Sequence, residues 1–231
     1  KEYKMKNKEK CPPLPLVIFG SGGIARETAF LIEEINLRRP NQFLILGFVE
    51  SDTTKIGERF GPYRVLCSDD TFPIFSKTFP RLGVVFPFGN PGIKRKVAEK
   101  ININQFTDLV FPNLIHPDVT FQQYSCEIGI GNIITFGVRL TVNVTLGNFN
   151  LINLNTTVGH DTIIGNYNVI NPLSAISGGV TINDEVLVGT GAKILQNLTV
   201  NSKVKIGAGA VVTKSVLEGE IVVGIPAKSR G

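Results

Sequence analysis

The stretch VTLGNFNLINLNTTVGHDTIIGNYNVI (residues 144–170) carries an aliphatic residue at every sixth position: Leu146, Ile152, Val158, Ile164 and Ile170. The same count runs through fifteen consecutive positions, from Ile128 to Val212, and all of them are Ile, Leu or Val. The residue two positions before each of them is never charged. A pattern of this length excludes coincidence and indicates a repeat architecture.

The six-residue period has a direct structural interpretation. Each hexad forms a short strand and a turn, and three hexads close one triangular coil of a parallel β-helix. The aliphatic side chain points inward and stacks on its counterpart one coil away, while Gly and Asn take the tight turns. Burial of these side chains does not by itself offset the conformational entropy lost by the repeat, so we expect an oligomer.

The first half of the chain follows a different rhythm, in which strand-like and helix-like segments alternate. The sequence predicts buried strands at LVIFG (16–20), FLILGFVE (43–50) and LGVVFPFG (82–89). Apolar residues at helical spacing follow the first and third strands, at residues 23–39 and 92–101. This alternation predicts a small parallel sheet covered by helices.

These patterns divide the chain into a flexible basic tail (residues 1–14), an α/β domain (15–112) and a β-helix domain (113–231). The first ten residues hold five Lys and two Glu, so they supply +3 of the formal net charge of +5. The rest of the chain is therefore close to neutral. A nucleic-acid-binding protein would instead gather basic residues on a folded face with aromatic platforms, so we expect no nucleic-acid partner.

Cysteine usage and hydropathy bear on the cellular compartment and on membrane and metal binding. Cys11, Cys67 and Cys126 have neither metal-ligand nor disulfide-framework spacing, which favours a reducing compartment. The apolar run LPLVIF (14–19) is too short for a signal sequence. No apolar run reaches the roughly 18 residues of a membrane span. We expect a cytoplasmic protein with no membrane partner and no metal.

A glycine-rich loop opens the first predicted helix. GSGGIA (residues 20–25) matches the pattern G-x-G-x-x-A after a strand, and such a loop at a helix N-terminus cradles phosphate. Taken alone the motif equally suggests NAD. The α/β half spans only about 95 residues, which is too short for a full dinucleotide-binding fold.

Several motifs together resemble one enzyme family. Besides the hexads, they are FGSGGIARE (19–27), VGHD (158–161), GAGAVVTKSV (207–216) and VVGIPAK (222–228). On these motifs residues 15–231 are similar to the hexapeptide-repeat sugar acyltransferases of the sialic acid O-acetyltransferase and UDP-bacillosamine N-acetyltransferase family. The resemblance implies a Rossmann-like nucleotide-sugar domain, a left-handed β-helix that binds acetyl-CoA as co-substrate, and a homotrimer.

The adjoining His160 and Asp161 are the candidate catalytic residues. Acetyl transfer to an amine or hydroxyl needs a base, and neutral imidazole suits that task near neutral pH. An adjacent carboxylate can orient the ring and stabilise its protonated form. The only other histidine, His116, precedes the regular coils and is interpreted as structural. The resemblance implies that His160 is the base and that Asp161 raises its basicity.

Asn153 lies seven residues before His160, where the family has an Asn that contacts the thioester or its oxyanion. It is equally interpretable as an ordinary turn residue. Cys126 falls at a small-residue core position of the repeat, so no cysteine is well placed to carry an acyl group. Direct attack in a ternary complex is favoured over a covalent intermediate.

The resemblance also implies two binding sites. The acetyl-CoA contacts, in the groove between neighbouring β-helices, match Asn168, Gly178, Thr190 and Ala208. Bacillosamine enzymes have a second His at the position of Asn168, so that contact must differ. Gly178 has a physical rationale, because a pantetheine arm close to the backbone leaves no room for a side chain.

On the acceptor side, the glycine loop would meet phosphate and the end of the second strand would meet the base or ribose. The residues implied are Gly20, Ser21, Gly22 and Gly23 for phosphate, Glu50 and Ser51 for the nucleoside, and Gly89 and Asn90 of a second loop. Some relatives carry a loop His where this chain has Ile24.

The first hypothesis is an acetyl-CoA-dependent N-acetyltransferase acting on a 4-amino-4,6-dideoxy sugar linked to UDP, dTDP or GDP. The second is O-acetylation of sialic acid or another glycan precursor. A third reading keeps the β-helix as a noncatalytic trimerisation module, against which the His160–Asp161 pair argues. A zinc hydratase would need three His ligands, and the chain has two His.

Overall fold

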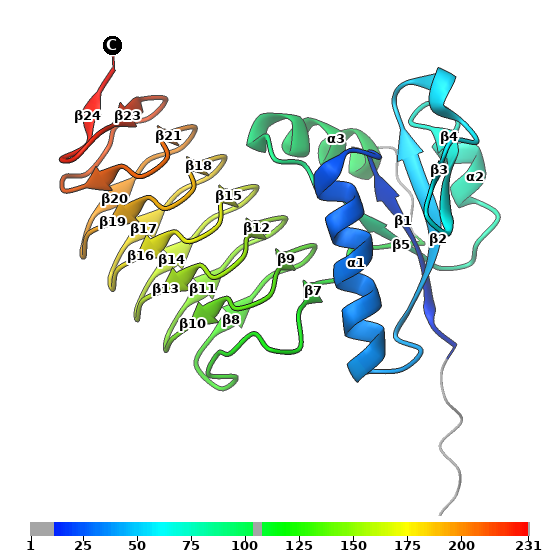
Figure 1. Cartoon of the computed structure of the whole chain (residues 1–231), viewed down its shortest axis with the longest axis horizontal. Coiled ribbons are helices and arrows are strands. Elements are labelled where there is room, and N and C mark those ends of the chain that lie inside the picture. The colour runs from blue at the N-terminus through cyan, green and yellow to red at the C-terminus, as the bar shows by residue number, and fades with distance from the viewer. Residues whose placement is uncertain (1–11, 104–107, 231) are drawn as a thin grey trace, which may run out of the picture.

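The computed structural model describes residues 12–103 and 108–230, so most of the predicted basic tail lies outside the described residues. A sheet with helices on its faces lies beside a prism of stacked triangular coils (Figure 1). The prediction of a Rossmann-like α/β half followed by a left-handed β-helix is confirmed.

The α/β half is built on one six-stranded sheet. Its strands are β1 (Leu14–Phe19), β2 (Phe43–Glu50), β3 (Arg59–Phe60), β4 (Tyr63–Ser68), β5 (Leu82–Val85) and β6 (Leu109–Val110). Their order is β3-β4-β2-β1-β5-β6, and every pair is parallel except the β3–β4 hairpin. The strand predicted over 82–89 ends at Val85, because Pro87 has no N–H to donate to a ladder.

The helices of this half are α1 (Gly23–Arg38), α2 (Phe72–Ser76), α3 (Pro91–Ile103) and the 3-10 turn η1 (Thr53–Lys55). α1 buries its apolar side chains on two sides. Its Leu31 and Ile32 belong to a core cluster that includes Leu16 of β1 and also Leu151 and Val169 of the β-helix. α1 is therefore packed between the sheet and the β-helix (Figure 1).

The second half consists of short parallel strands separated by turns. They are β7 (Leu114–Ile115), β8 (Glu127–Ile128), β9 (Ile133–Ile134), β10 (Arg139–Leu140), β11 (Thr145–Leu146), β12 (Leu151–Ile152), β13 (Thr157–Val158), β14 (Ile163–Ile164), β15 (Val169–Ile170), β16 (Ala175–Ile176), β17 (Thr181–Ile182), β18 (Leu187–Val188), β19 (Lys193–Ile194), β20 (Thr199–Val200), β21 (Lys205–Ile206), β22 (Val211–Val212), β23 (Ile221–Val223) and β24 (Lys228–Ser229). They form three faces, with strand orders β10-β13-β16-β19-β22, β20-β17-β14-β11-β8 and β24-β23-β21-β18-β15-β12-β9-β7.

The hexad pattern maps onto this prism residue by residue. Each aliphatic position is the second residue of one strand from β8 to β22, and it pairs with its counterpart eighteen residues away, as Leu146 does with Ile164. Fourteen of the fifteen side chains are at most 3% exposed; Ile128, in the first coil, is partly buried. The predicted inward stack is the core of this half.

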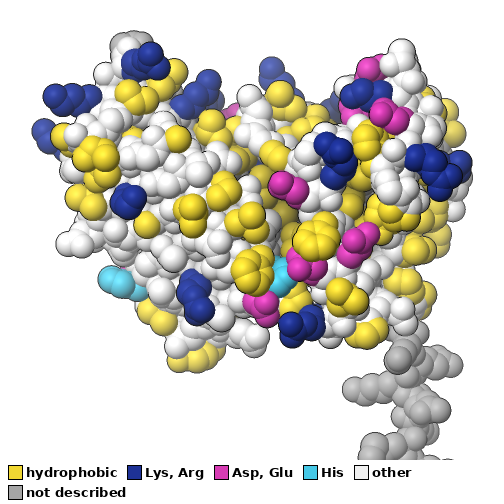
Figure 2. Space-filling view, viewed as in Figure 1, with side chains coloured by type: hydrophobic (Ala, Val, Ile, Leu, Met, Phe, Trp, Pro, Cys, Tyr) yellow, Lys and Arg dark blue, Asp and Glu magenta, His cyan; other side chains and the backbone are white. Residues whose placement is uncertain are grey.

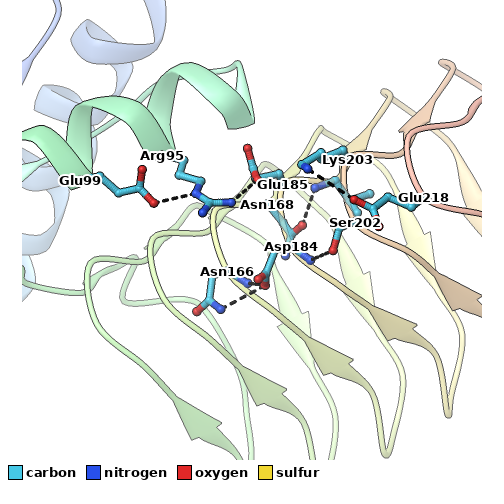
Figure 3. A network of polar contacts seen from close by, with 10 residues as sticks. Arg95, Glu99, Asn166, Asn168, Asp184, Glu185, Ser202, Lys203 and Glu218 are labelled. Carbon is cyan, nitrogen blue, oxygen red and sulfur yellow. Dashed lines mark hydrogen bonds and ion pairs between the residues drawn. The ribbon is translucent and has the colours of Figure 1, made fainter.

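A polar contact network fastens α3 to one corner of the prism (Figure 3). Arg95 Nη1 lies 2.6 Å from Glu185 Oε1, and Arg95 Nε lies 2.7 Å from Glu99 Oε1. The residue before Arg95 on α3, the fully buried Lys94, donates from Nζ to the backbone oxygen of Asn168 at 3.2 Å. The α/β half is thus held to the coils by the Arg95–Glu185 ion pair and the Lys94 hydrogen bond, as well as by the apolar face of α1.

Charged and apolar side chains are interspersed on the surface seen in Figure 2, and Lys and Arg do not gather into one stripe on that face. Among the described residues, no helix combines the length and the apolar character needed to cross a membrane.

Candidate active site

The turn after β13 presents an imidazole–carboxylate pair. His160 Nδ1 lies 2.7 Å from Asp161 Oδ2, and the two side chains are 66% and 58% exposed. Asp161 adopts a left-handed backbone conformation (φ 55°), which Asp and Asn tolerate better than most residues. The turn directs His160 outward because the inward position of this hexad is already taken by Val158.

The hydrogen bond to Asp161 determines which nitrogen of the neutral His160 ring carries the proton. A carboxylate only accepts, so Nδ1 must donate and Nε2 keeps its lone pair. Within residues 12–103 and 108–230, Nε2 has no hydrogen-bond partner. His160 therefore offers an outward-facing basic nitrogen, as a general base requires.

A second donor holds the other oxygen of the carboxylate. Asn143 Nδ2 donates to Asp161 Oδ1 at 2.9 Å. The hydrogen bonds from Asn143 and His160 lower the pKa of the Asp161 carboxyl. Asn143 is absent from the residues that the sequence analysis singled out.

Gly178 lies directly beneath His160. A Cβ on Gly178 would fall 2.5 Å from His160 Nε2 and 2.7 Å from Cε1. In this chain, it is therefore the imidazole that requires position 178 to have no side chain. The sequence had instead suggested that Gly178 makes room for the pantetheine arm of acetyl-CoA.

The remaining donor-site positions lie elsewhere on the prism. His160 follows β13 and Gly178 follows β16, which are neighbours on one face. Thr190 follows β18 and Ala208 follows β21, neighbours on another face, and both side chains are exposed. One chain thus presents the predicted acetyl-CoA contacts at two different corners.

Asn168 does not reach the surface. Its side chain is fully buried, where Oδ1 accepts the N–H of Val186 at 2.7 Å. Below it, Asn150 and Asn132 continue a ladder of asparagines inside the coils. The Asn168 side chain is closed to a ligand and therefore cannot contact acetyl-CoA at the surface.

Asn153 lies at the corner shared with Thr190 and Ala208, seven residues before His160 but one corner away from it. Its Oδ1 accepts the N–H of Leu154 at 2.8 Å, which leaves Nδ2 as a donor. It borders a cavity of about 400 Å³ between α1 and the coils, lined also by Glu27, Phe30, Leu31, Glu34, Thr135, Phe136 and Leu154. Asn153 and His160 of one chain do not meet.

The glycine loop and the end of β2 do meet. Ser21 donates to Glu50 Oε2 from its backbone N at 2.9 Å and from Oγ at 2.7 Å. Burial raises the pKa of the Glu50 carboxyl, but the bonds from Ser21, the Lys55 charge and the N–H of Ser51 outweigh it and the net pKa is lowered. The carboxylate thus fixes the loop and lies at the carboxyl edge of the sheet.

The loop backbone suits a bound anion. Gly20 has φ 83°, a conformation that favours glycine, and its N–H is held by Val49 O at 2.7 Å. Gly22 and Gly23 are exposed at the start of α1, where no side chain caps the helix. A helix N-terminus left open in this way offers backbone N–H groups to phosphate.

The second loop packs against the first. A Cβ on Gly89 would fall 2.7 Å from Ile24 Cδ1, so Gly89 admits the side chain that replaces the loop His of some relatives. Asn90 accepts the N–H of Ile93 at 3.1 Å through Oδ1 and so caps α3. The structure brings together all the predicted acceptor positions at one edge of the sheet.

His116 has a structural environment. It is 5% exposed; its Nδ1 accepts the N–H of Asp118 at 3.1 Å and its Nε2 lies 3.5 Å from Glu34 Oε2 on α1. It connects the segment that follows β7 to α1, and it lies against the ring of Phe136. In the part of the chain that the structure describes, no three His, Cys, Asp or Glu side chains form a metal-binding group.

A Rossmann-like half, a left-handed β-helix and an imidazole–carboxylate pair on a coil corner are the features that the resemblance to hexapeptide-repeat sugar acyltransferases implies. Comparison with solved structures confirms that structural resemblance over 94% of the chain. The acetyltransferase domain of PglB from Neisseria gonorrhoeae FA1090, in complex with acetyl coenzyme A, superposes with a TM-score of 0.80 at 27% identity, covering 94% of this chain and 99% of that one.

Two structures from Caulobacter crescentus match equally well. PerB, in complex with CoA and GDP-perosamine, gives a TM-score of 0.82 at 25% identity, with 94% and 97% of the two chains covered. A histidine variant of perosamine N-acetyltransferase with the same ligands gives 0.83 at 24% identity and the same coverage. No protein-family model matches the sequence, and no curated protein does.

Proposed function

We propose that this chain transfers the acetyl group of acetyl-CoA to the amino group of a nucleotide-linked 4-amino-4,6-dideoxy sugar, in the cytoplasm. The observation that carries the proposal is the outward His160, whose Nδ1 is held 2.7 Å from a carboxylate while Nε2 stays open. The full-length likeness to PerB with CoA and GDP-perosamine, and to the PglB domain with acetyl-CoA, supports it.

In the proposed reaction the sugar amine attacks the thioester carbonyl directly. His160 Nε2 takes the proton that the nitrogen loses as the C–N bond forms, and Asp161 stabilises the resulting imidazolium. The tetrahedral oxyanion is stabilised by a donor such as Asn153 Nδ2 of a second copy of the chain. The C–S bond then breaks, and the His160 imidazolium gives this proton to the departing CoA thiolate.

We propose that the donor site is completed between copies of the chain in a homotrimer. His160 and Gly178 occupy one corner of the prism, whereas Asn153, Thr190 and Ala208 occupy another. A neighbour that brings its second corner to the first would place both sets on one acetyl-CoA. Exposed Leu154, Leu173 and Leu195 supply apolar surface for such a contact.

The acceptor nucleotide is assigned to the carboxyl edge of the sheet. The open N-terminus of α1 at Gly22 and Gly23 would bind phosphate. Glu50 has its two oxygens oriented by Ser21 and Ser51 and would accept from the ribose or the base. Ser51, Gly89 and Asn90 border the same edge.

The test is a CoA-release assay over a panel of UDP-, dTDP- and GDP-linked amino and hydroxyl sugars. An amino-sugar substrate is expected, and turnover confined to hydroxyl acceptors would favour the O-acetyltransferase hypothesis.

His160→Ala should lower kcat by about 10²–10⁴-fold with little change in ligand affinity. Gln196→Ala, on the same corner one coil beyond Gly178, is the matched control. If His160→Ala kept more than about a third of kcat with chemistry rate-limiting, the assignment of the base would be wrong.

A further inference from the structure

Asn143 and Asp161 occupy the same turn in consecutive coils. They are eighteen residues apart, and both adopt the left-handed conformation, with φ 54° and 55°. The backbone ladder continues past them, since Asp161 N donates to Val142 O at 3.1 Å. This stacking brings the Asn143 amide to the carboxylate without any contact to His160 itself.

The two oxygens of Asp161 have different partners. Oδ1 accepts from Asn143 Nδ2 at 2.9 Å, and Oδ2 meets His160 Nδ1 at 2.7 Å. An exposed carboxylate with one partner can rotate and leave it for water, whereas one held at both oxygens has its plane defined. The Asn143 backbone is itself tied to the preceding coil, because its N–H donates to Ser125 Oγ at 3.0 Å.

Asn143 also has an ordinary reason to be there, because Asn tolerates a left-handed turn. The same column of turns offers a comparison. Asn197, two coils beyond Asp161, has φ 58° but no side-chain contact with His160 or Asp161 among the described residues. A purely structural role would make the two asparagines equivalent.

We propose that Asn143 is a positioning residue of the active site: its amide orients the Asp161 carboxylate, which in turn orients the His160 ring for proton transfer. The inference rests on the proposed function for its kinetic part. Its geometric part, that the amide governs the state of the carboxylate, stands independently of any activity.

The variants follow from the turn conformation. Glycine accepts a positive φ, so Asn143→Gly, Asn197→Gly and Asp161→Gly each remove a side chain without straining the backbone. Asn143→Gly should lower kcat by about 10-fold, inside the roughly 10²-fold that a small misplacement of a reacting group can cost. The KM values for both substrates and the thermal midpoint should stay close to those of Asn197→Gly.

A double-mutant cycle shows whether Asn143 acts through the carboxylate. In the Asp161→Gly background, Asn143→Gly should have no further effect on kcat. Equal effects of Asn143→Gly in both backgrounds would overturn the proposal, as would equal kcat for Asn143→Gly and Asn197→Gly. Asn143→Asp keeps the size and the turn but removes the donor, and it should also lower kcat; wild-type kcat in this variant would count against the role of the amide.

A measurement without turnover separates this inference from the proposed function. The carboxyl carbon of Asp161, followed by NMR across an acid titration, should titrate at higher pH in Asn143→Gly than in Asn197→Gly. If His160→Ala retained activity but this shift appeared, the general-base assignment would fail and the Asn143–Asp161 coupling would hold. If His160→Ala lost activity and no shift or kcat difference appeared, the positioning role alone would fail.

Discussion

The imidazole of His160 lies against the backbone of Gly178, so closely that a Cβ on that glycine would fall 2.5 Å from Nε2. The backbone of the next coil therefore packs against the ring of the proposed base and limits its position. Because the His160 side chain is 66% exposed, it can move away from an added methyl group without disturbing the core.

Gly178→Ala should leave the fold intact and displace the ring. We expect kcat to fall by about 10-fold or more, as misplacement of a reacting group does, with the thermal midpoint within about 2 °C of the parent value. Gly92→Ala is the control, since its added Cβ would meet nothing closer than 3.5 Å. A selective rise in the KM for acetyl-CoA with kcat unchanged would instead support the contact with the pantetheine arm.

Gly22→Leu tests the assignment of the acceptor site. A Cβ at Gly22 meets nothing within 4 Å, so the side chain projects into the space where phosphate is proposed to bind. The KM for the nucleotide sugar should rise at least about 10-fold, equivalent to about 1.4 kcal/mol of binding, while acetyl-CoA binding measured by calorimetry stays unchanged. Equal weakening of both ligands would contradict separate donor and acceptor sites.

Lys94 should make stability depend on pH. Burial lowers the pKa of its amine from 10.5 to about 7. Between these values the unfolded chain binds a proton that the folded chain does not, so stability rises with pH across that window and the gain is lost as pH falls through 7.

Urea unfolding at pH 7 and pH 9.5 should therefore show wild type gaining stability relative to Lys94→Met at the higher pH. Methionine has a similar length and no charge, and the backbone oxygen of Asn168 keeps its bond from Leu151 N. Lys96→Met, at an exposed position of the same helix, should parallel wild type. Parallel curves for Lys94→Met and wild type would mean that the amine is not held neutral.

Oligomeric state tests the proposed donor site. Sedimentation should give a mass near three times the 25.1 kDa of one chain. Leu154→Glu, at the exposed corner near Asn153, should weaken assembly and lower activity together, whereas Leu37→Glu, on the exposed side of α1, should alter neither. A stable monomer that is fully active at micromolar concentration would exclude a site shared between copies.

The sequence alone determined the β-helix, because one inward side chain per hexad is a local and strictly periodic requirement. That requirement accounts for the exact register from Ile128 to Val212 and for the burial of its members. The α/β half was predictable from alternating patterns of long strands and helices, whereas the β3–β4 hairpin and α2 were too short to leave a clear signal. His160 and Asp161 were predictable as a pair because adjacent residues at a turn need no tertiary information to meet.

Tertiary structure decided what lies one coil away from that pair. Asn143 and Gly178 each stand eighteen residues from a member of the pair, so the period contained the information, but only the stacked coils show an amide reaching the carboxylate and a ring resting on the glycine. The same period carried the signal for Asn168, which stands two residues before Ile170, at the uncharged inward position. The packing of α1 between sheet and coils, and the burial of Lys94, depend on contacts between distant segments, which no local pattern encodes.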